Sequence, residues 1–264
     1  MEKKNFYTHV NGMDFYCEMR GNGPLLVIIP DGSNDCEPYD RVSEYLKNDF
    51  TVLSFDPRGG SRSMDPEPHA VTPKILADDA AAIVAELGYE KASFYGCSSG
   101  GQAVLATALY HPELCRNAMV HEAALQADTP LPYAGIQYFK QVSTYAAHCD
   151  GFDPGDIGSI ADYDKWMELS DGCRKRIKEN SKFWGKYYLG TVDLVTYTDE
   201  ELAQMKNVDI SVGCWSAAWC VAANISVAKR GKFPYRWMMS SHSPHITCPE
   251  ELAEYIKTTC QKYC

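Results

Sequence analysis

The chain lacks an apolar run of the roughly 18–20 residues that a membrane-spanning helix needs, and its first residues lack the apolar stretch of a secretory signal. Positive charge is scarce as well: 25 lysines and arginines stand against 35 aspartates and glutamates, a net charge of −10 over 264 residues. Nucleic acids and anionic membranes bind cationic surfaces, so neither is expected as a partner. These features favour a soluble, cytoplasmic protein, and 45% hydrophobic residues can build a sizeable core.

Metal-binding cysteine patterns are also missing. The eleven cysteines are scattered from Cys17 to Cys264, and none forms a Cys-x-x-Cys pair or a Cys/His cluster with the spacing of a zinc site. Their number is odd, and a chain of this length can fold by burying its core without disulfides. We therefore expect reduced thiols, no structural metal and no cofactor.

What the chain does have is a regular alternation of apolar runs and helical patterns. Two alternating segments around Asn11-Gly12 predict a β-hairpin. Continuous apolar runs, typical of strands buried on both faces, follow at 25–29, 51–55, 92–95, 117–120 and 210–213, with a weaker one at 233–239. Helical patterns occupy 72–87, 101–110, 216–230 and 249–262. This order predicts an α/β fold, a mostly parallel sheet flanked by helices.

One long segment interrupts the alternation. Residues 125–205 contain no clear buried strand, and about 80 residues between two strands are too many for a bare loop. We expect a helical cap over the carboxyl edge of the sheet, where α/β folds bind ligands. The predicted domains are a core of residues 1–124 and 206–264 and a cap of residues 125–205.

The strongest motif is Gly96-Cys97-Ser98-Ser99-Gly100, which lies between the strand at 92–95 and the helix at 101–110. A Gly-x-Ser-x-Gly set in that context predicts a nucleophile elbow, a turn so tight that its flanking residues must be small. The N-terminus of the following helix favours developing negative charge. Ser98 is therefore the predicted nucleophile.

A serine nucleophile needs a base and an acid that orients the base. His242 and His245 follow the last strand, and we favour His242, which lies seven residues before Pro249, the predicted start of the final helix. His245 is then interpreted as a loop histidine that lines or supports the pocket. For the acid, no Asp or Glu occurs from Ile210 through Thr247, and Asp209 precedes its strand.

Glu122 follows the strand at 117–120, at the sheet edge that also carries Ser98, so it is the predicted acid. The alternative is that Glu122 only caps the entry to the cap. An oxyanion hole would use the backbone N–H of Ser99 and a second N–H from Gly32 or Ser33, after the strand at 25–29. The turn at 56–63 is interpreted as structural.

These motifs resemble the α/β-hydrolase superfamily over essentially the whole chain and, more narrowly, the fungal zearalenone lactonases, which open a resorcylic macrolactone. The narrower resemblance depends on Pro30-Asp31-Gly32, the serine motif and Arg116-Asn117-Ala118-Met119-Val120-His121-Glu122. It implies a triad of Ser98, Glu122 and His242, with Gly32 and Ser99 as oxyanion donors. Trp184 would match the cap tryptophan that packs on the ligand ring, with cap core as the alternative.

The sequence thus predicts a serine hydrolase of carboxylic esters, acting on a small apolar ester and more specifically a lactone, through an acyl-enzyme. The predicted substrate-binding residues are Asp31, Trp184, Tyr187, Tyr188, Trp215 and His245. The alternatives are a general carboxylesterase, hydrolysis of a carbon–carbon bond on the same triad, or a small-molecule receptor with slow turnover. The sequence does not distinguish a monomer from a homodimer.

Overall fold

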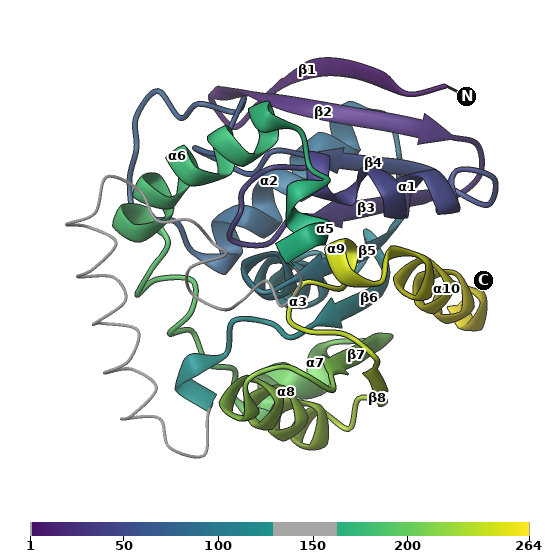
Figure 1. The fold of residues 1–264 in the computed structure, drawn as a ribbon. Coiled ribbons are helices and arrows are strands. Elements are labelled where there is room, and N and C mark those ends of the chain that lie inside the picture. Colours follow the sequence, from purple (N-terminus) through teal and green to yellow (C-terminus); the bar gives the residue numbers. More distant parts are fainter. Residues whose placement is uncertain (1, 129–162, 264) are drawn as a thin grey trace.

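An eight-stranded sheet runs through the centre of the structure, a computed structural model that describes residues 2–128 and 163–263 (Figure 1). The strand order is β1-β2-β4-β3-β5-β6-β7-β8. The strands are β1 (Lys4–Val10), β2 (Met13–Gly21), β3 (Leu25–Ile29), β4 (Thr51–Phe55), β5 (Ala92–Cys97), β6 (Cys115–His121), β7 (Val208–Gly213) and β8 (Tyr235–Met238). Strand β2 is antiparallel to β1 and β4, and the remaining pairs are parallel.

The expected hairpin and the six later strands are therefore confirmed. Asn11 and Gly12 both have positive φ, 49° and 79°, as a tight hairpin turn between β1 and β2 requires. The parallel strands are buried along their whole length in β3, β4, β5 and β7, which explains why their sequences are continuous apolar runs.

Helices cover both faces of this sheet. They are α1 (Asp40–Leu46), α2 (Pro73–Glu86), α3 (Ser99–Tyr110), α5 (Tyr163–Met167), α6 (Asp171–Tyr187), α7 (Asp199–Gln204), α8 (Ala218–Gly231), α9 (Pro244–Thr247) and α10 (Pro249–Cys260). Short 3₁₀ turns lie at Glu37–Tyr39, Gln126–Asp128 and Gln261–Tyr263. Successive residues of each strand point to opposite faces, so two separate hydrophobic clusters form.

The larger cluster joins one face of the sheet to α2, α3 and α8, and the smaller joins the other face to α1 and α10. In β3, for example, Val27 belongs to the first cluster and Ile28 to the second. The predicted fold class is thus confirmed. Among the described residues, no helix combines the length and apolar character that crossing a bilayer requires.

Helices α5, α6 and α7 fall in the segment predicted as a cap, whose residues 129–162 lie outside the described residues. Helix α6 passes over the loops that follow β3 and β4 (Figure 1). The end of the segment packs differently, because Tyr188, Val192, Tyr197, Leu202 and Met205 belong to the larger core cluster. The division into core and cap remains a prediction.

Candidate active site

Ser98 lies in the sharp turn between β5 and α3. Its backbone has φ 54° and ψ −119°, a left-handed conformation that a residue with a side chain rarely adopts. The turn is held by the Ser98 N–H, which donates to the His121 carbonyl, and by the Ser98 carbonyl, which accepts from the Gln102 and Ala124 N–H groups. This geometry is that of a nucleophile elbow.

Two glycines make the turn possible. A Cβ on Gly96 would lie 2.2 Å from the Gly100 carbonyl oxygen, and a Cβ on Gly100 would lie 2.1 Å from the Ile29 carbonyl oxygen. Both atoms belong to the backbone and cannot move aside. The small residues of the motif are therefore required by the close approach of three backbone segments.

Glu122 and His242 meet at the carboxyl end of β6. The His242 Nδ1 lies 2.8 Å from Glu122 Oε2, and Glu122 is completely buried while the His242 side chain is 26% exposed. Glu122 also has a positive φ of 43°. Since Nδ1 donates to the carboxylate, Nε2 is the ring nitrogen left to act as a base.

The Glu122 carboxylate has donors on both oxygens. Oε1 accepts the Gly213 N–H at 2.7 Å, and Oε2 accepts from His242 and from the Cys220 thiol, whose sulfur is 3.8 Å away. Burial favours the neutral acid, but the contacts with His242, His121 and the Gly213 N–H outweigh it and lower the pKa of Glu122 to about 2. Glu122 is therefore ionised at neutral pH.

The contact between Glu122 and His242 also raises the pKa of His242. Burial opposes protonation of the ring, but its contacts with Cys220 and with the Glu122 carboxylate raise the pKa of His242 well above its ordinary value. Asp209, which was expected to precede its strand, is the second residue of β7, and it is bound by Lys262 Nζ at 2.8 Å and by the Tyr263 hydroxyl at 2.6 Å. The carboxylate of Asp209 is therefore bonded to residues of the C-terminal segment and not to His242.

Two further histidines lie buried around this pair. His121 Nε2 donates to the Ser241 carbonyl at 3.3 Å, and its Nδ1 lies 3.0 Å from the Ser211 hydroxyl oxygen. The His245 ring stacks on Tyr39 with centroids 4.0 Å apart. Burial lowers the pKa of each histidine to about 4, so both are neutral at pH 7.

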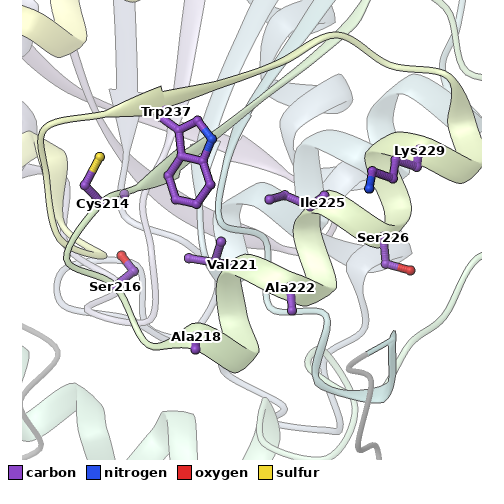
Figure 2. A pocket seen from close by; sticks show the side chains of 10 residues that line it. Cys214, Ser216, Ala218, Val221, Ala222, Ile225, Ser226, Lys229 and Trp237 are labelled. Carbon is purple, nitrogen blue, oxygen red and sulfur yellow. The ribbon is translucent and has the colours of Figure 1, made fainter.

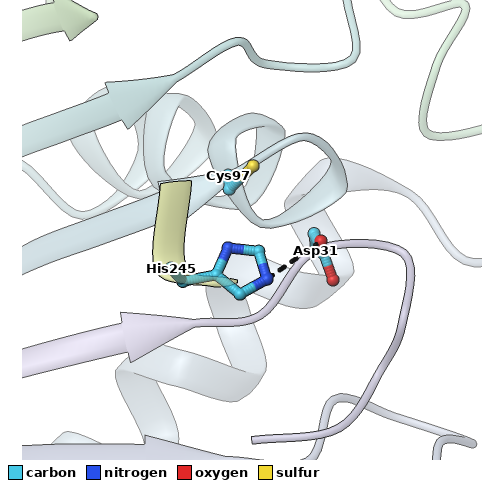
Figure 3. A group of neighbouring side chains, drawn as sticks. All are labelled: Asp31, Cys97 and His245. Carbon is cyan, nitrogen blue, oxygen red and sulfur yellow. Dashed lines mark ion pairs between the residues drawn. The ribbon is translucent and has the colours of Figure 1, made fainter. Parts of the chain in front are cut away.

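His245 also faces the turn that follows β3. Figure 3 shows its Nε2 directed at Asp31, whose Oδ2 is 3.6 Å away, with Cys97 beside them. Asp31 Oδ1 in turn accepts the Ser33 N–H at 3.0 Å, and the Asp31 carbonyl accepts the Asn34 N–H at 3.0 Å. His245 is 1% exposed, so it supports this turn rather than presenting a surface.

The turn at 31–34 carries the predicted oxyanion donors. Its Ser33 N–H is already engaged by Asp31, so this amide is not free to bind a substrate oxygen. Within the described residues, the N–H groups of Gly32 and Ser99 make no hydrogen bond. Gly32 and Ser99 are therefore the two donors that the geometry leaves open.

Helix α6 packs on this turn. The Trp184 ring lies so close to Gly32 that a Cβ there would be 2.9 Å from the indole Nε1. Nε1 is buried and has no hydrogen-bond partner among the described residues. Tyr187, one turn of helix away from Phe183, is half-buried, and the two rings lie 4.6 Å apart.

Two further predicted substrate-binding residues, Tyr188 and Trp215, differ in their exposure. Tyr188 is completely buried and donates its hydroxyl to the Arg58 carbonyl at 2.7 Å, so it offers no surface to a ligand. Trp215 follows β7 and is 64% exposed. Tyr188 is therefore not retained in the proposed pocket, whereas Trp215 stays a proposed substrate contact.

Sequence reasoning missed Asn180, which contacts the turns after β3 and β4 from α6. The spacing of four among Arg176, Asn180, Trp184 and Tyr188 could have indicated one helix face directed at the core. It also missed Cys220, because nothing in the sequence brings the start of α8 to Glu122.

A groove of about 650 Å³ lies beside α8, and Figure 2 shows Val221, Ile225 and the Trp237 ring around it. None of the predicted site residues lines this groove. One of its lining residues, Gly213, donates its N–H to Glu122, so the groove adjoins the surroundings of the candidate acid.

Three groups of side chains in the described part of the chain have the atoms and spacing to hold a metal ion: Asp31, Cys97 and His245; Glu122, Cys220 and His242; Asp35, Glu37 and Cys173. Their carboxylates already have donors, namely the Ser33 N–H, the Gly213 N–H with His242, and the Arg176 guanidinium. These contacts account for the groups without an ion.

A family model described as the alpha/beta hydrolase fold matches residues 24–212. Two curated relatives are zearalenone hydrolases. That of Cladophialophora bantiana is 29% identical over 96% of this chain and 95% of its own length, and that of Bionectria ochroleuca is 29% identical over 100% of both.

A solved structure gives the same fold. The enol-lactonase from Burkholderia xenovorans LB400 superposes with a TM-score of 0.79 at 19% identity, covering 97% of this chain and 99% of that chain. At this identity the likeness concerns the fold alone. The resemblance indicated by the motifs is confirmed, because the family model spans most of the chain and both zearalenone hydrolases match nearly all of it. The chain belongs to the α/β-hydrolase family.

Proposed function

We propose that this protein is a serine hydrolase that cleaves a carboxylic ester, and specifically a lactone, by a Ser98–His242–Glu122 triad. The observation that carries the proposal is the 2.8 Å contact between His242 Nδ1 and Glu122 Oε2, at the same sheet edge as the Ser98 elbow. A buried carboxylate on Nδ1 is the arrangement that prepares Nε2 to accept a serine proton.

In the first step Ser98 Oγ attacks the acyl carbon and His242 Nε2 takes its proton. The ring then carries a positive charge, which the ionised Glu122 stabilises. The carbonyl oxygen becomes an oxyanion, and the N–H groups of Gly32 and Ser99 bind it. Both donors belong to backbone that is fixed before the substrate arrives, so little reorganisation accompanies the step.

Collapse of this intermediate breaks the acyl–oxygen bond. His242 returns its proton to the leaving alkoxide, and the acyl group remains on Ser98. His242 next takes a proton from water, whose oxygen attacks the acyl carbon. The bond between the acyl carbon and Ser98 Oγ then breaks, and His242 returns the proton to Ser98 Oγ. In a lactone the alcohol stays tethered to the acid, so a single hydroxy acid is produced.

The preference for a lactone is supported by the two zearalenone hydrolase relatives. Trp184 supplies an aromatic surface beside Gly32, and Tyr187, three residues further along α6, is a second proposed aromatic contact. The unpartnered indole N–H of Trp184 is a donor that a carbonyl or hydroxyl group of the substrate would satisfy. A zearalenone-type macrolactone has both the ring and the oxygen atoms for these contacts.

A panel of macrolactones, short lactones and p-nitrophenyl esters, assayed on the wild type and on Ser98→Ala, tests the proposal. We expect the fastest wild-type turnover on a macrolactone and none in the variant. Fast turnover of linear esters alone would contradict the lactone assignment, and binding of a macrolactone without turnover would contradict the enzymatic proposal.

A further inference from the structure

Asn180 lies in the middle of α6 and is buried, 6% exposed, against the core. Its Oδ1 accepts the Ser61 N–H at 2.7 Å, which identifies the oxygen of the amide. Its Nδ2 donates to the Ser33 carbonyl at 2.7 Å and to the Ser61 hydroxyl at 2.8 Å, with the Asn34 carbonyl at 3.3 Å. One side chain thus joins the turn after β3 to the turn after β4.

Both turns contain strained backbone at the residues that Asn180 contacts. Asn34 has φ 50° and Ser61 has φ 45°, left-handed values that cost a non-glycine residue about 1 kcal/mol or more. The turns also touch directly, since a Cβ on Gly60 would lie 2.4 Å from Asn34 Cβ. Such conformations persist only where surrounding contacts hold them, and Asn180 supplies bonds on both sides.

The turn after β3 is the one that presents Gly32. The other backbone N–H groups of this turn are bonded: that of Asp31 to the Tyr39 hydroxyl, that of Ser33 to the Asp31 carboxylate and that of Asn34 to the Asp31 carbonyl. The Ser33 carbonyl accepts from Asn180. Among the described residues, the Gly32 N–H is the amide of this turn that makes no hydrogen bond. Its direction is therefore set by the bonds on either side of it.

We infer that Asn180 is a positioning residue, which acts through the turn at 31–34 to aim the Gly32 N–H at the oxyanion. The inference rests on the proposed function and extends it, because it makes the oxyanion donor depend on the seating of α6. A residue that only fastened α6 to the core would need neither the bond to the Ser33 carbonyl nor contacts in two strained turns.

Phosphonylation by a fluorophosphonate tests this inference without the natural substrate. Ser98 Oγ attacks phosphorus while His242 Nε2 takes its proton, fluoride leaves, and the phosphoryl oxygen occupies the oxyanion hole as charge develops on it. We expect Asn180→Ala to lower the maximal inactivation rate 10- to 100-fold with little change in the concentration that gives half of it, since removal of an oxyanion donor costs roughly 100- to 1,000-fold.

Asn180→Asp provides a variant of nearly the same volume. It retains an acceptor for the Ser61 N–H but loses the donor to the Ser33 carbonyl. If Asn180 positions the turn, the maximal inactivation rate falls as it does in the alanine variant. If Asn180 only fills space, the aspartate variant reacts at the wild-type rate, and the inference is overturned.

Ser170→Ala is the matched control. Ser170 caps α6 by accepting the Cys173 N–H and bonds Glu37, so its loss weakens the seating of α6 by roughly 1 kcal/mol without touching either turn. We expect a lower melting temperature and an unchanged inactivation rate. An equal loss of rate in this variant would overturn the specific role of Asn180.

Labelling of Ser98→Ala distinguishes a failure of the proposed function from a failure of the inference about Asn180. If that variant is labelled as fast as the wild type, the proposed function is wrong. If it is not labelled while both Asn180 variants react at the wild-type rate, only the inference about Asn180 is wrong.

Discussion

Ser98 combines a reactive position with a backbone conformation that ordinary residues avoid. Its φ of 54° is maintained by hydrogen bonds to His121, Gln102 and Ala124 rather than by its own side chain. Strain of this kind is found where the surrounding structure holds a residue for function. The Ser98 side chain is therefore dispensable for the fold, while its hydroxyl is essential to the proposed chemistry.

The first expectation follows from this separation. Ser98→Ala should reduce ester hydrolysis at least 1,000-fold because no other nucleophile occupies the elbow. The melting temperature should change by no more than a few degrees. Steady-state assays with an aryl ester and a thermal melt measure both quantities, and undiminished hydrolysis would remove Ser98 from the mechanism.

Glu122 gives a second expectation. Glu122→Gln keeps the shape but removes the charge that stabilises the His242 cation, so kcat should fall 100- to 10,000-fold. The matched control is Asp209→Asn, which changes an acid bonded to Lys262 and Tyr263 instead. A larger loss of kcat in the control than in Glu122→Gln would assign the acid to Asp209.

The pH profile provides a third expectation. The proposed base must be neutral to accept a proton, and the pKa of His242 lies above its ordinary value of about 6.5 because of its contacts, despite burial. Activity should therefore fall as the pH is lowered through this raised pKa, and kcat/KM should reach half its maximum above pH 6.5. In Glu122→Gln the loss of the negative partner should move this midpoint to lower pH.

The sequence predicts those site residues that belong to a local motif or that are left as candidates when a residue type is missing from a segment. The serine motif indicated Ser98, and the lack of acids from Ile210 to Thr247 directed attention to Glu122, which contacts His242 as that argument required. Cys220 and Asn180 could not be found this way. Each acts through a contact between segments about 100 residues apart or more, and no local pattern records it.

At the scale of elements, buried strands were the easiest feature to predict. The run at 25–29 coincides with β3 because every residue of that strand is buried on one face or the other. Helix α1 was not predicted, because it has only seven residues, of which three are buried, and so short a segment shows no clear helical repeat of apolar residues. Helix α6 is mostly polar, and its seating depends on individual contacts rather than on a wide apolar stripe.

The contact of α6 with the turn after β3 leads to a fourth expectation. A methyl group on Gly32 would lie 2.9 Å from Trp184 Nε1, so Gly32→Ala must displace the indole or the helix, at a cost of about 1–3 kcal/mol. Trp184→Leu removes the obstructing ring. In a double-mutant cycle, followed by urea unfolding, the double variant should be more stable than the sum of the single effects. Additive losses would show that the two residues are independent.

At the scale of the whole molecule, the sheet divides the core into two clusters, and the candidate site lies where the ends of its central strands meet helices from both faces. The surroundings of His242 include two other histidines, His121 and His245, that are buried and neutral. Neutral rings add no positive charge beside the proposed base. That arrangement has a consequence for stability, because a buried neutral histidine resists protonation while an unfolded one does not.

The fifth expectation is a loss of stability in mild acid. His121 and His245 have a pKa of about 4 in the folded protein and about 6.5 when unfolded, so between these values the unfolded chain binds more protons. The free energy of unfolding should therefore fall as the pH drops from 6.5 towards 4, by roughly 2 kcal/mol per histidine at pH 5. The carboxylate of Glu122, with a pKa of about 2, loses its own contribution to stability only below pH 4.5.

Urea unfolding at pH 7 and pH 5 measures the effect on the wild type and on His245→Phe. The phenylalanine can keep the stacking on Tyr39 but cannot titrate. The variant should lose about 2 kcal/mol less than the wild type, and an equal loss in both proteins would mean that His245 is already protonated in the fold.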